Sequence, residues 1–162
     1  MERTALVLTA SDGVTAGVRD DVSGSRVGAR LVDMGFDVER LALPDDRTDL
    51  EAALRVGAER HSLIVTTGGT GLTPRDVTPE ATRAVVDYEV PGMAEAMRAA
   101  GRAITPLADL SRGVVGVIGR TLVVNLPGSP KGAIESLDAI APILDHALET
   151  LAGPHDHGEG TA

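Results

Sequence analysis

The chain has 162 residues and a formal net charge of −9, with 15 basic and 24 acidic side chains. This length suits one domain with a sizeable core, and the acidic balance argues against non-specific binding to nucleic acid or anionic lipid. The lack of cysteine excludes disulfides, thiolate metal sites and a cysteine nucleophile. Only Phe36 and Tyr88 are aromatic, so the platforms on which bases stack are nearly lacking.

The first expected element is a strand over Thr4 to Ala10. Its continuous apolar run is typical of a strand covered on both faces of a parallel sheet. The N-terminal residues lack the basic lead and cleavage region of a signal peptide, and no apolar stretch reaches the roughly 18 residues of a membrane span. We therefore expect a cytoplasmic protein without membrane contact.

Polar residues follow this strand, and a helix comes after them. Ser11-Asp12-Gly13 places a hydroxyl, a carboxylate and a flexible turn at the carboxyl end of the strand, where open α/β sheets bind ligands. Taken alone, the same tripeptide is also typical of an ordinary turn. The helix is expected through Arg30 to Met34, with Asp20 and Asp21 as capping acids and Gly35 as its stop.

A second strand is expected over Phe36 to Leu43, where apolar and polar residues alternate as in a strand near a sheet edge. Asp45 and Asp46 stand at its carboxyl end, and we expect one of them to serve chemistry and the other to face solvent. Thr48 and Glu51 have the spacing of a capping box, which predicts the next helix.

The third expected strand runs from Ser62 to Thr67 and leads directly into a glycine-rich loop. Three glycines within four residues let the backbone adopt positive φ and bring N–H groups close to an anion. The candidate binding residues of this loop are Thr67, Gly68, Gly69, Thr70 and Gly71. The loop matches neither the Walker pattern nor the dinucleotide pattern, and the glycines alone are equally typical of a tight turn.

The loop closes with Arg75-Asp76, a cation beside a carboxylate, and Thr78-Pro79-Glu80 then matches the N-cap, proline and acidic first turn of a helix. The charged pair and the capped helix favour an anion site over a simple turn. Three strand–helix units in the first eighty residues predict a parallel, doubly wound sheet whose ligand loops share one edge.

Two more helices are expected before the next strand. Met93 to Ala100 forms the first, with Met93 and Met97 packed in the core. Thr105-Pro106 opens a second, short helix. At its end, Ser111-Arg112 either holds a phosphate or only ends the helix with favourable charge.

A β-hairpin is expected over Val114 to Asn125, with a two-residue turn at Gly119-Arg120, and it adds an antiparallel piece beside the parallel sheet. A second donor-rich loop follows and opens the last helix, so that it could face the first loop across a cleft. Its candidate binding residues are Asn125, Pro127, Gly128, Ser129 and Lys131. The last helix is expected to reach about Leu151 and to bend or restart at Pro142.

We expect one domain over residues 1–152 and a disordered tail over residues 153–162. His155 and His157 in the tail are more typical of solvent-exposed bystanders than of a metal site. His61 and His146 lie in or beside expected helices and are interpreted as structural. Since no histidine lies in the ligand loops, the pattern does not fit a Ser-His-Asp hydrolase.

Three carboxylates, Asp12, Asp45 and Asp76, are expected at or after strand ends, beside two loops rich in hydrogen-bond donors. Carboxylates hold Mg²⁺, which bridges phosphate oxygens, and N–H groups together with Lys or Arg stabilise developing charge. This combination suits phosphoryl or nucleotidyl transfer.

A family resemblance is carried by three segments, Thr66 to Gly71, Arg75 to Ala81 and Asn125 to Lys131. They resemble the molybdenum-cofactor biosynthesis proteins of the Mog and MoaB type, and the similarity runs from about Ala5 to about Leu151. The resemblance implies a three-layer α/β/α fold with a mostly parallel sheet and a small antiparallel hairpin. It also implies a homotrimer, or a hexamer formed by doubling it.

Proteins of this family bind molybdopterin and activate it with Mg-ATP, giving adenylylated molybdopterin and pyrophosphate. The resemblance implies that Asp45 and Asp76 are the catalytic acids, which position Mg²⁺, the nucleotide and the attacking phosphate. It makes the loop from Gly68 to Gly71 the nucleotide cradle. The positions matched to substrate binding are Ser11, Asp12, Gly13, Arg75, Ser111 and Asn125, with the loop from Pro127 to Lys131.

Two alternatives remain. A non-catalytic molybdopterin carrier or scaffold of the same family would have the same core, but the intact Arg75-Asp76-Val77-Thr78-Pro79 segment resembles the catalytic type. A generic nucleotide hydrolase would need a water-activating base, and the sequence offers none. Other proteins of the molybdenum cofactor pathway are expected as partners.

Overall fold

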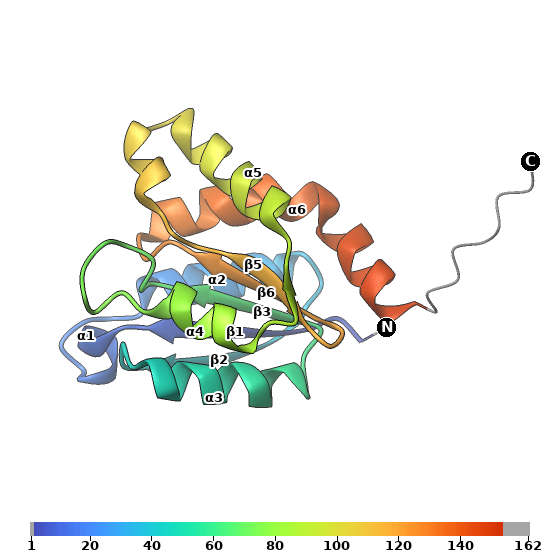
Figure 1. The fold of residues 1–162 in the computed structure, drawn as a ribbon, viewed down its shortest axis with the longest axis horizontal. Helices are drawn as coiled ribbons and strands as arrows, with labels where there is room; N and C mark the ends of the chain where they lie inside the picture. Colours follow the sequence, from blue (N-terminus) through green and yellow to red (C-terminus); the bar gives the residue numbers. More distant parts are fainter. Residues whose placement is uncertain (1, 154–162) are drawn as a thin grey trace, which may run out of the picture.

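The protein is described by a computed structural model that covers residues 2–153 (Figure 1). In this part of the chain, a single six-stranded sheet has the strand order β2-β1-β3-β6-β5-β4. Its strands are β1 Thr4–Ala10, β2 Asp37–Leu43, β3 Leu63–Thr67, β4 Tyr88–Glu89, β5 Val115–Ile118 and β6 Thr121–Leu126. The helices are α1 Asp12–Thr15, α2 Val22–Asp33, α3 Arg47–Ala58, α4 Thr78–Val85, α5 Pro91–Arg102, the 3-10 helix η1 Pro106–Leu110 and α6 Pro130–Ala152.

The sheet combines a parallel part with an antiparallel part. β1 pairs in parallel with β2 and β3, and β3 pairs in parallel with β6. β5 is antiparallel to both β6 and β4. The predicted fold is therefore confirmed, with β2 at the edge, and the carboxyl ends of β2, β1, β3 and β6 lie along one side of the sheet.

Helices cover both faces of the sheet. On one face α2, α5 and α6 pack together, and on the other α3 packs against α4 (Figure 1). β1 contributes Ala5 and Val7 to the core cluster on one face and Leu6 and Leu8 to the cluster on the other. The continuous apolar run of this strand therefore has the predicted cause, which is burial on both faces.

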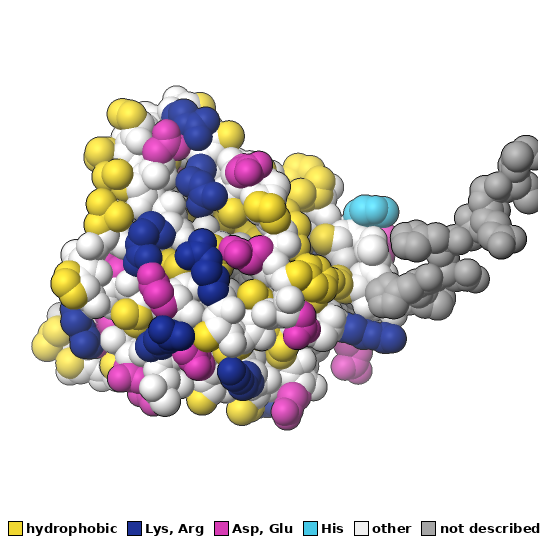
Figure 2. Space-filling model, in the orientation of Figure 1, with side chains coloured by type: hydrophobic (Ala, Val, Ile, Leu, Met, Phe, Trp, Pro, Cys, Tyr) yellow, Lys and Arg dark blue, Asp and Glu magenta, His cyan; other side chains and the backbone are white. Residues whose placement is uncertain are grey.

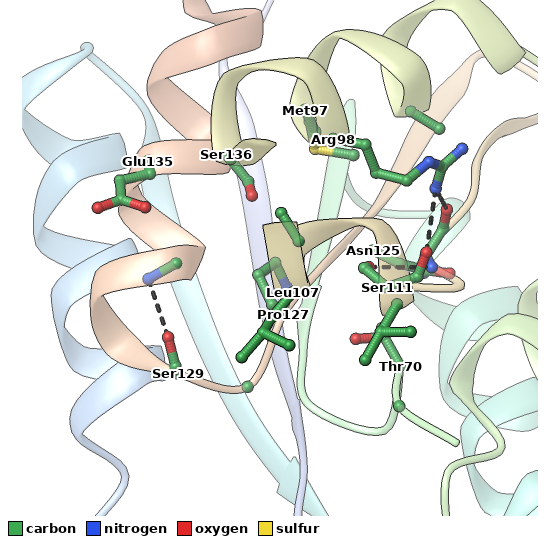
Figure 3. A pocket seen from close by; sticks show the side chains of 18 of the residues that line it. Thr70, Met97, Arg98, Leu107, Ser111, Asn125, Pro127, Ser129, Glu135 and Ser136 are labelled. Atoms are coloured by element: carbon green, nitrogen blue, oxygen red, sulfur yellow. Dashed lines mark hydrogen bonds between the residues drawn. The ribbon is translucent and has the colours of Figure 1, made fainter. Parts of the chain in front are cut away.

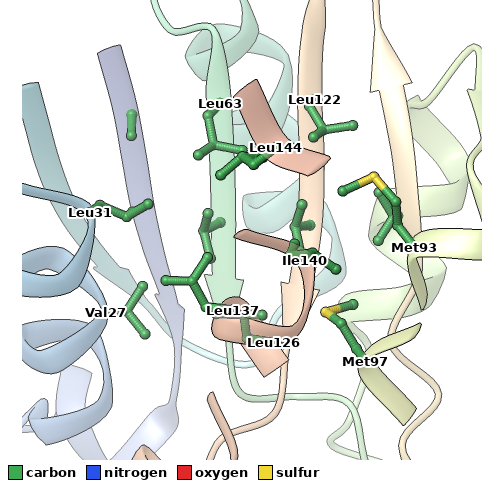
Figure 4. Packing of buried hydrophobic residues seen from close by; sticks show 14 of the residues in the cluster. Val27, Leu31, Leu63, Met93, Met97, Leu122, Leu126, Leu137, Ile140 and Leu144 are labelled. Atoms are coloured by element: carbon green, nitrogen blue, oxygen red, sulfur yellow. The ribbon is translucent and has the colours of Figure 1, made fainter. Parts of the chain in front are cut away.

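The larger core cluster lies under α6. Leu137, Ile140 and Leu144 of this helix are fully buried and lie over the strand residues Leu63 and Leu122 (Figure 4). The predicted core role of the two methionines of α5 is confirmed, because Met93 and Met97 are 4% and 6% exposed in the same cluster.

Several local predictions need correction. Ser11-Asp12-Gly13 does not form a simple turn, because Ser11 caps the short helix α1 and its Oγ accepts from the Val14 amide at 3.2 Å. The capping box at Thr48 was wrong. The N-cap lies two residues earlier, at Asp46, which accepts from the Asp49 amide at 3.0 Å, so α3 begins at Arg47.

The N-cap assignment at Thr78 was also wrong. Val77 occupies that position without a side-chain hydrogen bond, and Thr78 is the first residue of α4. Strand β4, Tyr88–Glu89, was not predicted, since only two residues pair there. Pro142 lies inside one helix, which changes direction along its length in Figure 1; a proline there removes a backbone hydrogen bond.

Acidic and basic side chains are interleaved on the face over α4 and α5 (Figure 2). The ion pairs Arg83–Glu89, Arg102–Asp109 and Arg112–Glu80 belong to these elements and their neighbours. This face therefore carries no large field of one sign despite the net charge of −9. None of the helices in residues 2–153 is long and apolar enough to cross a membrane. The predicted tail, with His155 and His157, lies outside the described residues apart from Gly153.

Candidate functional site

Two cavities of about 540 Å³ each lie at the carboxyl edge of the parallel strands. They share a wall, which we define as Gly69, Asp76, Gly128 and Ser129. The glycine loop after β3 provides part of this wall and the loop after β6 provides the rest. The two donor-rich loops therefore meet as predicted, but they separate two cavities and do not enclose one cleft.

The first cavity, here called the apolar cavity, lies between the shared wall, α5, η1 and the start of α6 (Figure 3). Met97, Leu107, Leu110 and Pro127 line it. Ser111 adds a polar group to the lining, which also includes Thr70 and Gly71 of the glycine loop. A mostly apolar surface with few polar groups is typical of sites that bind small organic molecules.

The second cavity, here called the polar cavity, lies on the other side of the shared wall. Ser11, Asp45 and Thr67 line it from the ends of β1, β2 and β3. Ser23 in the first turn of α2 also lines it, and its buried Oγ makes no hydrogen bond in the structure. The N-terminal ends of α2 and α6 both border this cavity, which favours phosphate groups there.

The glycine loop needs glycine for two reasons. Gly68 and Gly69 have φ of +88° and +67°, which side chains other than glycine rarely adopt. A Cβ on Gly68 would lie 2.4 Å from the Ala10 carbonyl oxygen, and one on Gly69 would lie 2.3 Å from Thr78 Oγ1. The predicted positive φ is confirmed at Gly68 and Gly69 but not at Gly71. At the first two positions the loop packs too closely against its neighbours to hold a side chain.

Asp12, Asp45 and Arg75 form one hydrogen-bonded group. The Asp12 amide donates to Asp45 Oδ2 at 3.1 Å, and the Asp45 amide donates to Asp12 Oδ1 at 3.0 Å. Arg75 donates to both carboxylate oxygens of Asp12, with Nε at 3.0 Å from Oδ2 and Nη2 at 2.9 Å from Oδ1. This group ties the loops after β1 and β2 to the segment that carries Asp76.

The two carboxyl groups differ in their acidity. The Asp45 amide and the Arg75 guanidinium lower the pKa of Asp12. Burial, followed by repulsion from Asp12 and Asp76, raises the pKa of Asp45 despite its bond to the Asp12 amide. Asp45 therefore carries negative charge that no neighbouring cation compensates fully.

Asp76 borders both cavities. Its Oδ2 accepts from the Thr73 amide at 2.9 Å and from the Thr73 hydroxyl at 2.8 Å. A Cβ on Gly71 would lie 2.9 Å from this oxygen. The carboxylate is thus fixed by its own loop, beside the shared wall.

A bound Mg²⁺ usually takes one or two protein carboxylates and completes its shell with substrate phosphates and water. Asp45 and Asp76 fit this role, because both border the polar cavity and their mutual repulsion contributes to the raised pKa of Asp45. Residues 2–153 hold no cluster of three or more metal-ligating side chains.

Most of the predicted binding residues line a cavity. The predicted residues at the polar cavity are Ser11, Asp45, Thr67, Gly68, Gly69, Asp76, Gly128 and Ser129. Those at the apolar cavity are Gly69, Thr70, Gly71, Asp76, Ser111, Asn125, Pro127, Gly128 and Ser129. Ser11 and Ser111, both matched to substrate binding, line different cavities on opposite sides of the wall.

Four predicted binding residues line neither cavity. Gly13 lies within α1, while Asp12 and Arg75 bond to each other outside the walls. Lys131 was predicted at the site, but its side chain is largely exposed and its Nζ lies 3.8 Å from Glu135 one turn along α6. The second residue of that helix points away from the wall, whereas Ser129 caps the helix by accepting from the Gly132 amide at 2.9 Å.

Asn125 has a structural role that the sequence did not indicate. Its Nδ2 donates to Thr66 Oγ1 at 3.1 Å and to Thr82 Oγ1 at 3.0 Å, and its Oδ1 accepts from the Val114 amide at 3.2 Å. The residue is 1% exposed. Its amide group therefore joins β6 to β3, α4 and the start of β5, and it has no free donor for a substrate.

Arg112 does not present its guanidinium to either cavity. It donates to the carbonyl oxygens of Gly71 and Asp76, both at 2.8 Å, and pairs with Glu80. The pairing lowers the pKa of Glu80. The sequence suggested that Ser111-Arg112 either holds a phosphate or ends a helix with favourable charge. Arg112 instead binds partners that lie more than thirty residues away in the sequence.

Residues 6–146 match the family model described as a probable molybdopterin binding domain. The chain belongs to this family. The family and the fold implied by the resemblance are thus confirmed.

Individual members of the family cover most of the chain. A molybdopterin adenylyltransferase of Helicobacter pylori strain J99 is 37% identical over 91% of this chain and 86% of its own length. The crystal structure of the molybdopterin biosynthesis enzyme MoaB from Thermus thermophilus is 50% identical and superposes with a TM-score of 0.87, over 93% of this chain and 97% of that one. A molybdenum cofactor biosynthesis bifunctional protein of Synechococcus elongatus is 38% identical over 95% of this chain, which spans 49% of that protein.

Proposed function

We propose that the protein is a molybdopterin adenylyltransferase, which transfers the adenylyl group of Mg-ATP to molybdopterin and releases pyrophosphate. The observation that carries this proposal is the position of Asp76 in a wall between two cavities of equal volume. A reaction between two substrates needs two adjoining sites and a common point where their phosphates meet. The relatives named molybdopterin adenylyltransferase support the choice of substrates.

In the proposed reaction, a terminal phosphate oxygen of molybdopterin forms a bond to the α-phosphorus of ATP. The bond from that phosphorus to the bridging oxygen breaks, and pyrophosphate leaves with the electron pair. A phosphate monoester has a second pKa of about 6 and is largely ionised near neutral pH. The attacking oxygen therefore needs no general base, in agreement with the lack of histidine in the ligand loops.

The residues of the wall would hold and orient the phosphates. Asp45 and Asp76 would hold Mg²⁺, which when bound neutralises charge on the phosphate oxygens and on the departing pyrophosphate. Gly69 and Gly128 bring backbone into the wall without side chains, so a phosphate can approach closely. Asp12 holds the Asp45 amide and keeps that carboxylate at the cavity edge.

Each cavity would take one substrate. Substitutions that narrow the apolar cavity, such as Ala94→Leu, should raise KM for one substrate, whereas Ser23→Val in the polar cavity should raise KM for the other. If both variants raised KM for the same substrate, the division of the two substrates between the cavities would be wrong.

The extent and assembly of the catalytic unit are also proposed. Residues 1–152 would suffice for the reaction, and a homotrimer or hexamer stays a prediction that light scattering would check. The bifunctional relative contains a further segment about as long as this chain. This supports the expectation that other proteins of the molybdenum cofactor pathway act beside it.

The direct test incubates the purified protein with molybdopterin, ATP and Mg²⁺ and follows pyrophosphate release and the mass of the pterin product. We expect pyrophosphate only when molybdopterin is present, together with an adenylylated product. Tight molybdopterin binding without turnover would contradict the enzyme proposal and favour the carrier or scaffold alternative. The absence of both molybdopterin binding and turnover would contradict the enzyme proposal and the carrier or scaffold alternative alike.

A further inference from the structure

The segment that carries Asp76 has little structure of its own. Residues 71–76, here called the acid loop, contain no helix or strand, and Leu72 within it is 65% exposed. Inside the loop, the Asp76 amide donates to the Thr73 carbonyl at 3.0 Å, and Thr73 donates to the Asp76 carboxylate. These bonds shape the loop, but they do not fix it relative to the sheet.

Arg112 fixes the two ends of the acid loop. Its Nε donates to the Gly71 carbonyl and its Nη2 to the Asp76 carbonyl, each at 2.8 Å. The Arg112 backbone amide donates to the Thr70 carbonyl at 2.9 Å. One guanidinium therefore holds the first and the last residue of the loop together.

Arg112 is itself held from two sides. Its Nη1 forms an ion pair with Glu80 in the first turn of α4. On the other side, Arg98 of α5 donates from Nη1 to the carbonyl oxygens of Gly113 at 2.9 Å and Ser111 at 3.4 Å, the two neighbours of Arg112 (Figure 3). The backbone around Arg112 is thus fixed to a helix that also lines the apolar cavity.

We propose that Arg112 is a positioning residue, which acts through the acid loop to place the Asp76 carboxylate in the shared wall. The proposal rests on the adenylyl transfer proposed above. The planar guanidinium is needed because it directs several N–H groups to separate acceptors at once, whereas a lysine ammonium on a flexible stem cannot hold both carbonyls in this geometry. Ser111 lines the apolar cavity, so the same short segment connects that cavity to Asp76.

The first test compares Arg112→Lys with Arg30→Lys. Arg30 is a matched control, because it also joins two elements through an ion pair, with Asp138 at 2.8 Å, and is similarly exposed. For Arg112→Lys we expect kcat to fall about 100-fold, the scale of a misplacement near 1 Å, with small changes in KM. Arg30→Lys should keep the kcat of the wild type.

The second test is a double-mutant cycle with Asp76→Asn. If Arg112 acts through Asp76, adding Arg112→Lys to Asp76→Asn should lower kcat by less than about threefold, since coupled residues are not additive. A purely structural role would give the full loss in both backgrounds. Multiplicative effects would therefore overturn the proposal.

The third test measures hydrogen exchange of the amides in the acid loop and needs no turnover. We expect exchange of the Thr73 and Asp76 amides, which donate hydrogen bonds within the loop, to be at least about tenfold faster in Arg112→Lys than in the wild type and in Arg30→Lys. Unchanged exchange would overturn the positioning role even if the wild type is active. Conversely, faster exchange in Arg112→Lys, together with a wild type that shows no adenylyl transfer, would contradict the proposed function while the positioning role of Arg112 stands.

Glu80→Gln guards against a variant that does not fold. It keeps the guanidinium and its two carbonyl bonds but removes the charge that aligns it. We expect an intermediate loss of kcat and an intermediate rise in the exchange rate of the Thr73 and Asp76 amides. Wild-type behaviour on both readouts would contradict a role for this ion pair in placing Asp76.

Discussion

Asp12 and Asp45 each accept a hydrogen bond from the other's backbone amide, at 3.0 and 3.1 Å. The exchange looks symmetrical, but Arg75 pairs with Asp12 alone. The pKa of Asp12 is therefore lowered, while burial and the charges of Asp12 and Asp76 raise the pKa of Asp45. Of these two adjoining acids, Asp12 is paired with a cation and Asp45 is not.

Asp45→Asn should make the protein more stable at neutral pH. A raised pKa means that the folded state prefers the protonated acid, so this contribution is fully present below the ordinary pKa of 3.8 and is lost as pH rises through the raised value. The amide of Asn removes the charge and can still accept from the Asp12 amide. We expect a gain of up to about 1 kcal/mol in the free energy of unfolding at pH 7, limited by solvent screening, and loss of adenylyl transfer.

Urea unfolding at pH 7 and at pH 3 checks this. The gain from Asp45→Asn should shrink at pH 3, where the wild-type acid is protonated too. Equal gains at both pH values would show that the charge of Asp45 is not their cause. The contribution of Asp12 to stability has the opposite pH dependence. It is present above 3.8, because the pKa of Asp12 is lowered, and it is lost as pH falls through the lowered value.

Asp46→Ala should separate the two adjacent acids after β2. Asp46 caps α3, so its loss should lower the free energy of unfolding by about 1 kcal/mol. Its side chain lines neither cavity, and kcat should stay within about twofold of the wild type. Thermal unfolding and the adenylylation assay measure the two effects. A large loss of kcat in a folded Asp46→Ala variant would show that Asp46, and not Asp45, serves the chemistry.

Asp76→Asn should strongly reduce Mg²⁺-dependent turnover while molybdopterin binding is largely kept. The substitution removes one metal-facing charge and preserves the shape of both cavities, so we expect kcat to fall at least about 100-fold. Calorimetry with molybdopterin and the pyrophosphate assay check the two statements. Asp37→Asn, on the exposed edge strand β2, is the matched control. Near wild-type turnover by Asp76→Asn would falsify the role of Asp76.

Gly69→Ala and Gly119→Ala form a matched pair. Both glycines have positive φ, +67° and +58°, so each alanine adds about 1 kcal/mol of backbone strain. Only at Gly69 would the new Cβ meet an atom, Thr78 Oγ1 at 2.3 Å, whereas nothing lies within 4 Å at Gly119. We expect Gly69→Ala to lower the free energy of unfolding by about 1–3 kcal/mol more than Gly119→Ala does. It should also lose activity. Denaturant unfolding of the two variants measures this difference. Equal losses of unfolding free energy would mean that the glycine loop accommodates the new Cβ without strain.

Asn125→Ala tests whether this residue holds the fold or the substrate. Removal of the amide leaves the Val114 amide and two threonine hydroxyls without their buried partner, so we expect a loss of about 2–4 kcal/mol in the free energy of unfolding. Thr82→Val, which removes one of these bonds, should lose less. If Asn125→Ala unfolds like the wild type but has a raised KM, Asn125 binds substrate directly after all.

The sequence determined most of the strands and helices and the edge of the sheet at which the two cavities lie. Burial on both faces makes β1 and β3 largely apolar, while β2 has no buried residue and carries more charged side chains because it lies at the edge. The order of strands and helices then puts the loops after β1, β2, β3 and β6 on one side of the sheet. Periodicity and turn chemistry are local properties, so they can be read without the fold.

The division of the site into two cavities was decided by the tertiary structure. Ser11 and Ser111 are equally polar in the sequence, yet they lie on opposite sides of a wall built from two distant loops. Lys131 precedes Gly132 in a donor-rich motif, but the helical turn that Ser129 caps directs the lysine outward. Which side of a wall a side chain faces depends on the packing of elements that are far apart in the chain.

The same limit explains Asn125 and Arg112. A polar residue in a loop motif looks like a ligand contact, because the sequence does not show which buried donors and acceptors its side chain must satisfy. The partners of Asn125 and Arg112 lie in β3, α4 and the acid loop, many residues away. The sequence by itself determined the family and the fold, and it predicted Asp45 and Asp76 near the sheet edge where the polar cavity lies. Only the tertiary structure decided that the side chains of Asn125 and Arg112 bond to partners within the protein, because hydrogen bonding between distant segments exists only once the sheet has formed.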